Sequence, residues 1–410
     1  MTIKQHKVSA IVLAGGEGTR LLPLTLTRCK PAVPFGGRYR IVDISISNAL
    51  ASGVSKLFII SQFLADTLNR HIQDTYHTEA QQTKNIELLH PERLGTEAYL
   101  GTADAVRKNL KYILQHDSEY FFILSGDQLY SMDLEKMLTF AIEKQADLTI
   151  ASLPIQETDC TRLGVLRINE NHQITDFAEK PKAPERIAQL RSFKNTTSHL
   201  GSMGIYLFRR EALIHLLKHD LREDFGKHLI PTKMDLGNSY AYPFDGYWED
   251  IGTIGSYHKA HIDLFNHTTG FSLYHTPSPI YTHPTYLPAP RIAQTQLNHA
   301  IVCDGSDVYA DQIVRSLIGI GTEVGQGSRI HDSVILGNIP SSPISRPVHT
   351  RIGQDCEITH TIMDEGAQIG NHVRLINQQK LQTYQDDHLI VKDGIIVVKN
   401  NAQIPDHFVF

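Results

Sequence analysis

Residues 12–21 read V-L-A-G-G-E-G-T-R-L, and this stretch decides the fold of the first half of the chain. The apolar run over residues 8–13 predicts a buried strand. That strand leads directly into a loop whose candidate binding residues are Gly15, Gly16, Gly18 and Thr19. Because glycine has no Cβ, successive backbone N–H groups in such a loop can turn toward one anion. The stretch therefore predicts a phosphate-binding loop, with a plain glycine turn as the alternative.

Two cations follow the glycines at a spacing that suits a nucleoside triphosphate. Arg20 carries a planar charge that matches phosphate oxygens, and Lys30 comes ten residues later in K-P-A-V-P-F-G-G. The loop has neither the G-K-[ST] of a P-loop nor the G-x-G-x-x-G of a dinucleotide-binding turn. We therefore expect a triphosphate clamp of another type.

The composition of the 410-residue chain is that of a globular protein with room for two or three domains. Charged residues make up 20% of the chain and the formal net charge is −5, which argues against a nucleic-acid partner. Apolar runs are too short for a membrane span, and we expect no secretory leader. The four cysteines are scattered without a C-x-x-C pair, so we expect no disulfides, no structural zinc and a cytoplasmic location.

Short apolar runs alternate with helical patterns over residues 1–270. Strands are predicted at 11–13, 57–60, 121–124 and 148–151, and amphipathic helices at 99–115 and 134–144. This alternation predicts an α/β domain whose mostly parallel sheet binds ligands at the carboxyl ends of its strands. The polar stretch 183–198 has no clear pattern and predicts an exposed insertion.

The period changes after a proline-rich linker at residues 271–300. Over 301–410 aliphatic residues recur every six positions, in the rows Val302, Val308 and Val314, then Ile318, Val324, Ile330 and Leu336, then Ile352 with Ile358 and Ile369 with Leu375. This period fits a parallel β-helix, in which each short strand turns one aliphatic side chain inward. A proline-bearing insert at 338–347 interrupts the coils, and an exposed end of the stack favours oligomer contacts.

Carboxylates follow two predicted strands. Asp127, in S-G-D, comes just after the strand at 121–124, where it can hold Mg²⁺ against phosphate oxygens; capping the next helix is the alternative. Asp250, in W-E-D-I-G-T, is the second candidate, and the spacing allows Glu249 instead. Because Mg²⁺ takes one or two protein carboxylates, this pair predicts a magnesium site.

Two more segments offer contacts to a phosphate. Lys180, in E-K-P after a predicted strand at 173–178, is a point charge suited to a monoester phosphate, or a solvated lysine. Tyr99 precedes G-T-A-D-A-V, which opens a predicted helix whose N-terminus can face an anion.

Eight motifs occur in one order along the chain: G-G-E-G-T-R-L-x-P-L-T, K-P-A-V-P-F-G-G-R-Y-R, G-T-A-D-A-V, S-G-D-Q-L-Y, E-K-P, S-M-G-I-Y, D-F-G-K and Y-W-E-D-I-G-T. Together they resemble the glucose-1-phosphate adenylyltransferases (ADP-glucose pyrophosphorylases), nearly end to end. P-I-Y-T and G-I-I-V-V-K-N resemble the cyanobacterial and plant branch. The resemblance implies a Rossmann-like, GT-A-like catalytic domain followed by a left-handed parallel β-helix. It also implies that ATP and glucose 1-phosphate react to ADP-glucose and diphosphate, in glycogen or α-glucan synthesis.

The resemblance implies a role for each matching residue. Arg20 and Lys30 hold the triphosphate and the departing diphosphate, Asp127 is the catalytic aspartate, and Asp250 shares its Mg²⁺. The nucleotide contacts are Gly15, Gly16, Gly18, Thr19 and Gly101. The residues that bind glucose 1-phosphate are Tyr99, Gly164, Glu179, Lys180 and Ser202.

Some positions depart from the family pattern. His90 and Pro91 stand where relatives often have a glutamine pair near the adenine, which leaves UDP-, dTDP- or GDP-sugar synthesis open as an alternative. Glu365 stands where the plant-type pattern has lysine, and this reversed charge would weaken binding of a phosphorylated activator.

The resemblance also bears on regulation and assembly. Three cationic positions match those that bind anionic metabolite effectors in this family, namely Arg38, Lys392 and Lys399. A homotetramer is implied. A non-catalytic regulatory subunit is an alternative role, and an acyltransferase β-helix is a third.

Overall fold

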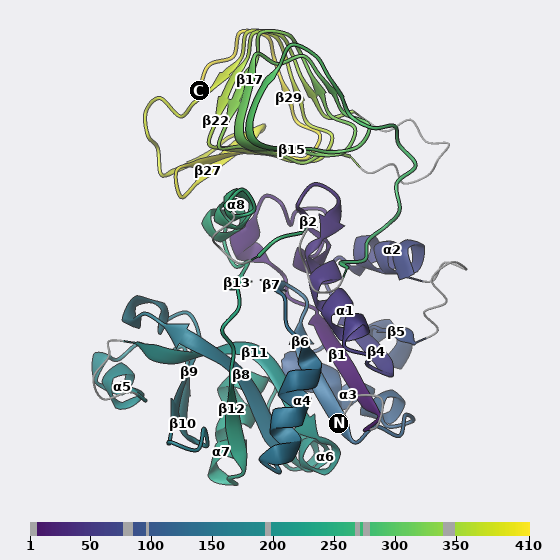
Figure 1. Cartoon of the computed structure of the whole chain (residues 1–410), viewed down its shortest axis with the longest axis vertical. Helices are drawn as coiled ribbons and strands as arrows, with labels where there is room; N and C mark the ends of the chain where they lie inside the picture. The colour runs from purple at the N-terminus through teal and green to yellow at the C-terminus, as the bar shows by residue number, and fades with distance from the viewer. Residues whose placement is uncertain are drawn as a thin grey trace.

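The computed structural model describes residues 6–410 except 77–84, 96–97, 193–197, 267–270, 274–278 and 339–348. Helices and strands alternate in the first domain, and a triangular stack of short strands forms the second domain above it (Figure 1). The insert predicted at 338–347 lies outside the described residues except for Asn338. Within the described part of the chain, no helix is long and apolar enough to cross a membrane.

A nine-stranded mixed sheet forms the centre of the first domain, in the order β10-β9-β11-β6-β1-β4-β5, with β8 beside β11 and β12 beside β8. The strands are β1 (Val8–Ala14), β4 (Lys56–Ser61), β5 (Ile86–Leu89), β6 (Tyr120–Ser125), β8 (Leu148–Ile155), β9 (Gly164–Ile168), β10 (Ile174–Glu179), β11 (His199–Arg209) and β12 (Ser239–Pro243). Only β10 and β11 run against the others. The mostly parallel sheet and its four predicted strands are confirmed.

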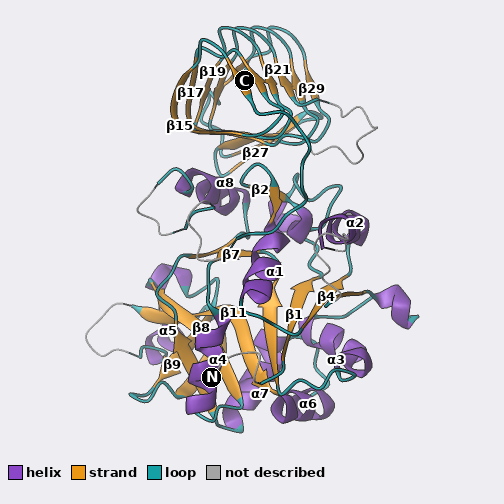
Figure 2. Ribbon diagram, turned by 45° about the vertical axis from the view of Figure 1, so that its right-hand side comes forward, coloured by secondary structure: helices purple, strands orange, loops and turns teal. Residues whose placement is uncertain are grey.

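Helices cover both faces of this sheet (Figure 2). One face carries α1 (Ile41–Ala51), α2 (Ala65–Tyr76) and α4 (Leu134–Glu143), and the other carries α3 (Thr102–Ile113), α6 (Arg210–His219) and α7 (Ile230–Asp235). Because side chains alternate along a strand, Val12 of β1 joins the first layer and Ile11 the second. The two predicted helices are confirmed as α3 and α4.

The stretch predicted as an exposed insertion at 183–198 is mostly exposed where the structure describes it, but it contains a short helix that the prediction missed. Helix α5 (Pro184–Gln189) turns Ile187 inward, and Leu190 follows it into a small core with Cys160 and Val165. Two apolar residues three apart cover one helical turn, which is too short to stand out as a period in a polar stretch.

The second domain is a parallel β-helix built on two sheets. The six-stranded sheet contains β14 (Arg291–Ile292), β16 (Asp307–Val308), β18 (Glu323–Val324), β21 (Arg351–Ile352), β24 (Gln368–Ile369) and β29 (Gln403–Ile404). The ten-stranded sheet contains β15 (Gln296–Val302), β17 (Gln312–Ile318), β19 (Arg329–His331), β20 (Val334–Ile335), β22 (Glu357–Thr359), β23 (Thr361–Met363), β25 (Arg374–Leu375), β26 (Thr383–Gln385), β27 (Leu389–Lys392) and β28 (Ile395–Val398). Strands β26, β27 and β28 pair antiparallel and β28 rejoins the parallel stack beside β23.

Aliphatic side chains stack in rows along the inside of the coils, as the six-residue period predicts. One row links Ile313, Ile330, Ile358 and Leu375 across successive coils, and all four are buried. Val314 was expected in such a row, but Ile313 takes the inward place. The corner after Val308 is one residue shorter than the corners that precede Ile330 and Ile358.

The segment between the domains is anchored to α1. The backbone N–H of Tyr281 donates to Ser47 Oγ at 2.9 Å, and Thr282 Oγ1 donates to Asp43 Oδ2 at 2.8 Å. Asp43 is fully buried and also accepts hydrogen bonds from Tyr76 and the Arg40 backbone. One carboxylate thus holds the start of α1, the end of α2 and the connecting segment together.

Replacing Ile358 tests the role of the aliphatic rows. Ile358→Ala leaves a cavity between Ile330 and Leu375, so we expect the free energy of unfolding to fall by about 2–5 kcal/mol in denaturant titrations. The neighbouring Glu357→Ala removes only a half-exposed pair with Arg374, and we expect a change within about 1 kcal/mol. Equal effects of the two changes would contradict the stacking account.

Candidate active site

A small two-stranded sheet brings the two predicted aspartates together. Strand β7 (Gln128–Tyr130) follows Asp127, and β13 (Trp248–Asp250) pairs with it antiparallel so that Asp250 lies opposite Gln128. The backbone N–H of Ile251 also contacts the Asp127 carbonyl at 3.4 Å. Residues 123 positions apart in the sequence therefore share one site.

Lys30 lies between the two carboxylates. Its Nζ is 2.6 Å from Asp127 Oδ2 and 3.6 Å from Asp250 Oδ1, and its side chain is only 9% exposed. A 3₁₀ turn over Lys30–Ala32 holds the lysine at this position. Two acids and one base converge, as the sequence predicted from separate motifs.

The environment separates the pKa values of these groups. Burial pulls the pKa of Asp127 upward, but the Lys30 ammonium outweighs burial and brings it below its ordinary value. Burial dominates at Asp250, so its pKa is raised despite Lys30. Burial lowers the pKa of Lys30, but Asp127 and Asp250 together raise it above its ordinary value. Lys30 therefore stays charged.

The structure distinguishes Asp250 from Glu249. Successive residues of β13 point to opposite faces, so Asp250 faces Lys30 while Glu249 Oε2 lies 3.6 Å from Lys259 Nζ on the far side. Asp250 is the carboxylate that meets Asp127.

The glycine loop borders this site as its sequence predicted. Gly18 adopts a left-handed φ of 67°, and a Cβ there would lie 3.1 Å from the Cβ of Lys30. Open space surrounds the Cα of Gly16, and Gly15 lies against Gln62. The backbone of the loop therefore lies against the side chain of Lys30.

Arg20 lies near the same carboxylate, in a 3₁₀ turn over Thr19–Leu21. A Cβ built on Gly252 would lie 3.1 Å from Asp250 Oδ2 and 3.4 Å from Arg20 Nη2. Gly252 thus lets the arginine and the aspartate approach from two sides. Arg20 also helps to lower the pKa of Asp250 against the effect of burial.

The residues expected to bind the sugar phosphate form a second group. Lys180 Nζ lies 3.3 Å from Glu179 Oε1, and a Cβ on Gly164 or on Gly226 would lie 2.9 Å from Glu179 Oε2. Both glycines leave room for this partly buried carboxylate. Burial raises the pKa of Glu179, with Lys180 opposing the shift.

Ser202 connects this second group to the aspartates. It is buried on β11, and its Oγ accepts a hydrogen bond from the Gly204 N–H at 3.2 Å. A Cβ on Gly204 would lie 3.3 Å from Nε2 of Gln128, the residue after Asp127. The two groups therefore lie along one continuous edge of the sheet.

The structure corrects the expectation for the N-terminus of α3. The backbone N–H groups of Ala103 and Asp104 donate to the Glu223 carbonyl at 2.7 and 3.1 Å, so this helix end binds the chain's own oxygen rather than an anion. A Cβ on Gly101 would lie 2.6 Å from that carbonyl, which explains the glycine. Tyr99 is buried, and its hydroxyl accepts from Asn109 Nδ2 at 2.8 Å.

Sequence reasoning did not single out Arg162 or Gln128 as residues of the site, and it included Asp224 only as part of a motif. Arg162 acts electrostatically on Asp250, and it lies next to Leu163, whose carbonyl accepts from the Lys180 N–H at 3.0 Å. Gln128 accepts from Trp248 Nε1 at 3.3 Å. Asp224 faces Glu179, and the D-F-G-K motif already pointed to it.

The donor set fits a magnesium ion. Asp127 and Asp250 turn their oxygens toward one point, which the Lys30 ammonium faces. Among the described residues, no three His, Cys, Asp or Glu side chains are grouped to hold a metal. Two carboxylates suit Mg²⁺, which completes its shell with phosphate oxygens and water.

The three effector candidates do not converge within one chain. Arg38 donates to Thr285 Oγ1 at 3.5 Å and lies beside Cys303, which follows β15. Lys399 follows β28, four strand spacings away in the sheet, or roughly 19 Å. Its Nζ donates to the Asp386 carbonyl at 2.5 Å, and Lys392 ends the neighbouring strand β27.

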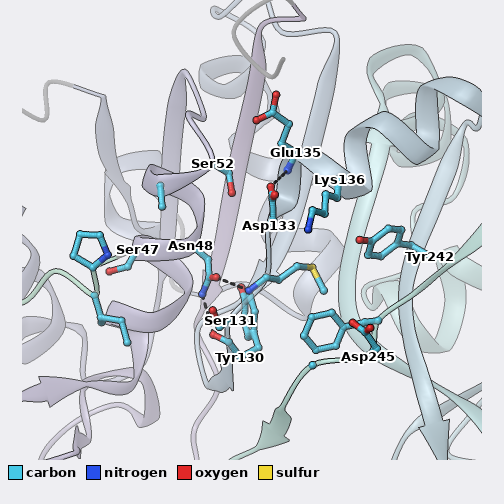
Figure 3. A pocket seen from close by; sticks show the side chains of 16 residues that line it. Ser47, Asn48, Ser52, Tyr130, Ser131, Asp133, Glu135, Lys136, Tyr242 and Asp245 are labelled. Atoms are coloured by element: carbon cyan, nitrogen blue, oxygen red, sulfur yellow. Dashed lines mark hydrogen bonds between the residues drawn. The ribbon is translucent and has the colours of Figure 1, made fainter. Parts of the chain in front are cut away.

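A separate cavity of about 390 Å³ lies between α1, the N-terminus of α4 and the segment after β12 (Figure 3). Its polar groups hold the turn that follows β7. Asn48 donates to the Tyr130 carbonyl and accepts from the Met132 N–H, while Asp133 caps α4 by accepting from the Glu135 N–H. Residues that line this cavity therefore hold the end of β7 and the turn after it. The predicted site residues do not line the cavity.

Comparison with known families agrees with this geometry. Residues 9–267 match the family described as nucleotidyl transferase, and the chain belongs to that family. Residues 285–409 match the GLGC left-handed parallel β-helix domain, which confirms the predicted left-handed β-helix. A nucleotidyl transferase domain followed by this β-helix is the architecture of ADP-glucose pyrophosphorylase.

Removing the Lys30 charge should change how stability depends on pH. In Lys30→Met, burial would raise the pKa of both Asp127 and Asp250, so the folded variant binds protons that the unfolded chain releases. We expect an unfolding free energy about 3 kcal/mol below wild type at pH 8, with the gap narrowing toward pH 5. Denaturant titrations at several pH values measure this, with the exposed Lys136→Met as control. A gap that widens as pH falls would contradict the assignment.

Proposed function

We propose that this chain is a glucose-1-phosphate adenylyltransferase that converts ATP and glucose 1-phosphate into ADP-glucose and diphosphate, in glycogen or α-glucan synthesis. The observation that carries the proposal is the convergence of Asp127 and Asp250 on Lys30, beside the glycine loop and Arg20. A non-catalytic subunit would have no need of this set. Its retention favours an enzyme.

The reaction needs alignment and charge neutralisation rather than a general base. The attacking group is a phosphate oxygen, which is mostly ionised at neutral pH because its second pKa is about 6. Lys30 and Arg20 hold the triphosphate and balance the charge that gathers on the departing diphosphate. Lys180, placed beyond Glu179 on the same edge, holds the sugar phosphate from the other side.

Asp127 and Asp250 are the residues that would hold Mg²⁺. When bound there, the ion polarises the α-phosphate and neutralises charge as bonds change. Asp127 also receives a short hydrogen bond from Ser125 Oγ, which fixes the orientation of its carboxylate. Asp250 is oriented by its place in β13.

We place the contacts to the nucleotide base at the edge of the sheet beyond the glycine loop, near the end of β5. His90 follows β5 and its Nδ1 is buried without a hydrogen-bond partner in the described part of the chain. The proposal commits to adenine, and a uridine, thymidine or guanosine nucleotide is the alternative.

Assembly and regulation follow the same family likeness. We propose a homotetramer in the cytoplasm, with the exposed strand β15 as a candidate contact, regulated by an anionic metabolite near Arg38, Lys392 and Lys399. Within one chain Arg38 is remote from the two lysines, so such an effector would contact one part of this set.

A diphosphate-release assay with glucose 1-phosphate and each of four nucleoside triphosphates tests the proposal. We expect turnover to be fastest with ATP, and Asp127→Asn to lower kcat at least about 100-fold because it removes a principal electrostatic stabiliser. Faster turnover with another nucleotide would reassign the product. An Asp127→Asn variant with near-normal turnover would remove Asp127 from the chemistry.

Lys180 should act on one substrate only. We expect Lys180→Ala to raise the KM for glucose 1-phosphate about tenfold or more, since it removes a charge-assisted contact to the phosphate, and to leave the KM for ATP within twofold. Lys182→Ala, two residues away and exposed, is the matched control. Steady-state kinetics in both substrates separate the two constants. An unchanged KM for glucose 1-phosphate would exclude Lys180 from the sugar-phosphate site.

A further inference from the structure

Two buried charged residues, Arg28 and Asp364, and two partly buried ones, Arg40 and Glu365, form an ion-pair network across the boundary between the domains. Arg28 Nη1 lies 3.0 Å from Asp364 Oδ1 and 3.3 Å from Glu365 Oε2, and Arg28 Nη2 donates to Asp364 Oδ2 at 3.2 Å. Arg40 Nη2 lies 3.2 Å from Glu365 Oε1. The arginines come from the catalytic domain, and the two acids follow β23 of the β-helix.

The network is electrically balanced inside the protein. Burial would raise the pKa of Glu365, but Arg40 and Arg28 outweigh burial and lower it. Burial lowers the pKa of Arg28, and Asp364 and Glu365 raise it above its ordinary value. Removing the Glu365 carboxylate would take away the ion pair of Arg40 and leave Arg28 with Asp364 alone.

The network holds both ends of the turn that carries Lys30. Arg28 precedes Lys30 by two residues. At the other end, Arg40 Nη1 donates to the carbonyl of Ala32, the last residue of the Lys30–Ala32 turn, at 3.0 Å. Arg28 binds the β-helix acids through both Nη atoms, whereas Arg40 binds the turn through Nη1 and Glu365 through Nη2. These contacts fix the turn relative to the second domain.

We propose that Asp364 and Glu365 are positioning residues for Lys30, so that the β-helix holds the catalytic lysine between Asp127 and Asp250. The proposal rests on the proposed function. Glu365 supplies, from within the chain, the negative charge that Arg28 and Arg40 require. The β-helix is thereby a part of the catalytic apparatus, although none of its side chains touches a substrate.

Other contacts between the domains provide a comparison. His258 Nε2 lies 2.7 Å from the Asp332 carbonyl, and the Gly255 N–H donates to Asp393 Oδ2 at 3.2 Å. Both involve α8 (Ile254–Asp263), which does not carry Lys30. If the network only joined the domains, cutting an α8 contact would have a similar effect on catalysis.

Kinetics of Glu365 variants distinguish these roles. In Glu365→Ala and the isosteric Glu365→Gln we expect kcat/KM for ATP to fall roughly tenfold or more, because a small displacement of Lys30 misaligns the triphosphate. The KM for glucose 1-phosphate should stay within twofold. Sodium formate should restore much of the loss in Glu365→Ala by filling the vacated carboxylate position, and should not affect wild type. Asp393→Ala, which cuts an α8 contact, should remain within twofold of wild type.

Three results would overturn the proposal: kinetics of both Glu365 variants within twofold of wild type, equal changes in the KM of both substrates, or no rescue by formate. Unfolding midpoints of each variant are measured first, and the Gln variant carries the test if the Ala variant does not fold. Hydrogen exchange of the Ala32 and Val33 amides, which donate to the carbonyls of Cys29 and Lys30 within the turn, is the second readout. It should quicken in Glu365→Ala and slow again with formate, whereas unchanged exchange would overturn the proposal.

The exchange measurement does not depend on turnover. A wild-type chain that is inactive with all four nucleotides would refute the proposed function. The positioning of the Lys30–Ala32 turn by Glu365 could still be tested by hydrogen exchange. An active wild type whose Glu365 variants behave normally would refute only the positioning role.

Discussion

The ammonium group of Lys30, held between the carboxylates of Asp127 and Asp250, is the interaction on which the rest of the site depends. Without it two partly buried carboxylates of like charge would face each other with reduced solvent screening. The β7–β13 pairing brings the two aspartates together, the 3₁₀ turn places Lys30 between them, and Gly18 of the glycine loop lies against the lysine. Strands and turns of the first domain thus hold the side chains of Lys30, Asp127 and Asp250 together.

The two domains meet beside the turn that holds Lys30. The β-helix presents acids toward the same short segment that carries the lysine, while the connecting segment binds the start of α1 through Asp43. A buried charge tolerates little movement of its partner, so both domains constrain one turn. This arrangement makes Glu365, a residue at odds with the plant-type pattern, consistent with its surroundings rather than an anomaly.

Sequence reasoning recovered whatever depends on local pattern. The alternation of apolar runs with helical patterns predicted the sheet, and the six-residue period predicted the coils, because both patterns follow from local backbone geometry. The site was predictable where motifs carry charge at strand ends, as with Asp127 and Lys30. Contacts set by distant packing were not. Nothing near Gly101 indicates that the Glu223 carbonyl covers the α3 N-terminus, and nothing near Arg28 indicates Asp364. The sequence also did not indicate that the corner after Val308 is one residue shorter than the others. For this reason Ile313, and not Val314, lies in the inward row.

Arg28 and Asp364 are 336 positions apart in the chain, and this separation has a consequence for biosynthesis. Domains generally fold as they leave the ribosome, beginning at the N-terminus. The first domain is therefore synthesised before Asp364 and Glu365 are translated. During that interval Arg28 and Arg40 lack these ion-pair partners. A polypeptide released early, before the last coils, lacks the acids that pair with Arg28 and Arg40 at the boundary between the domains. Cellular proteases would remove such fragments in preference to finished molecules, so that quality control is built into the order of synthesis.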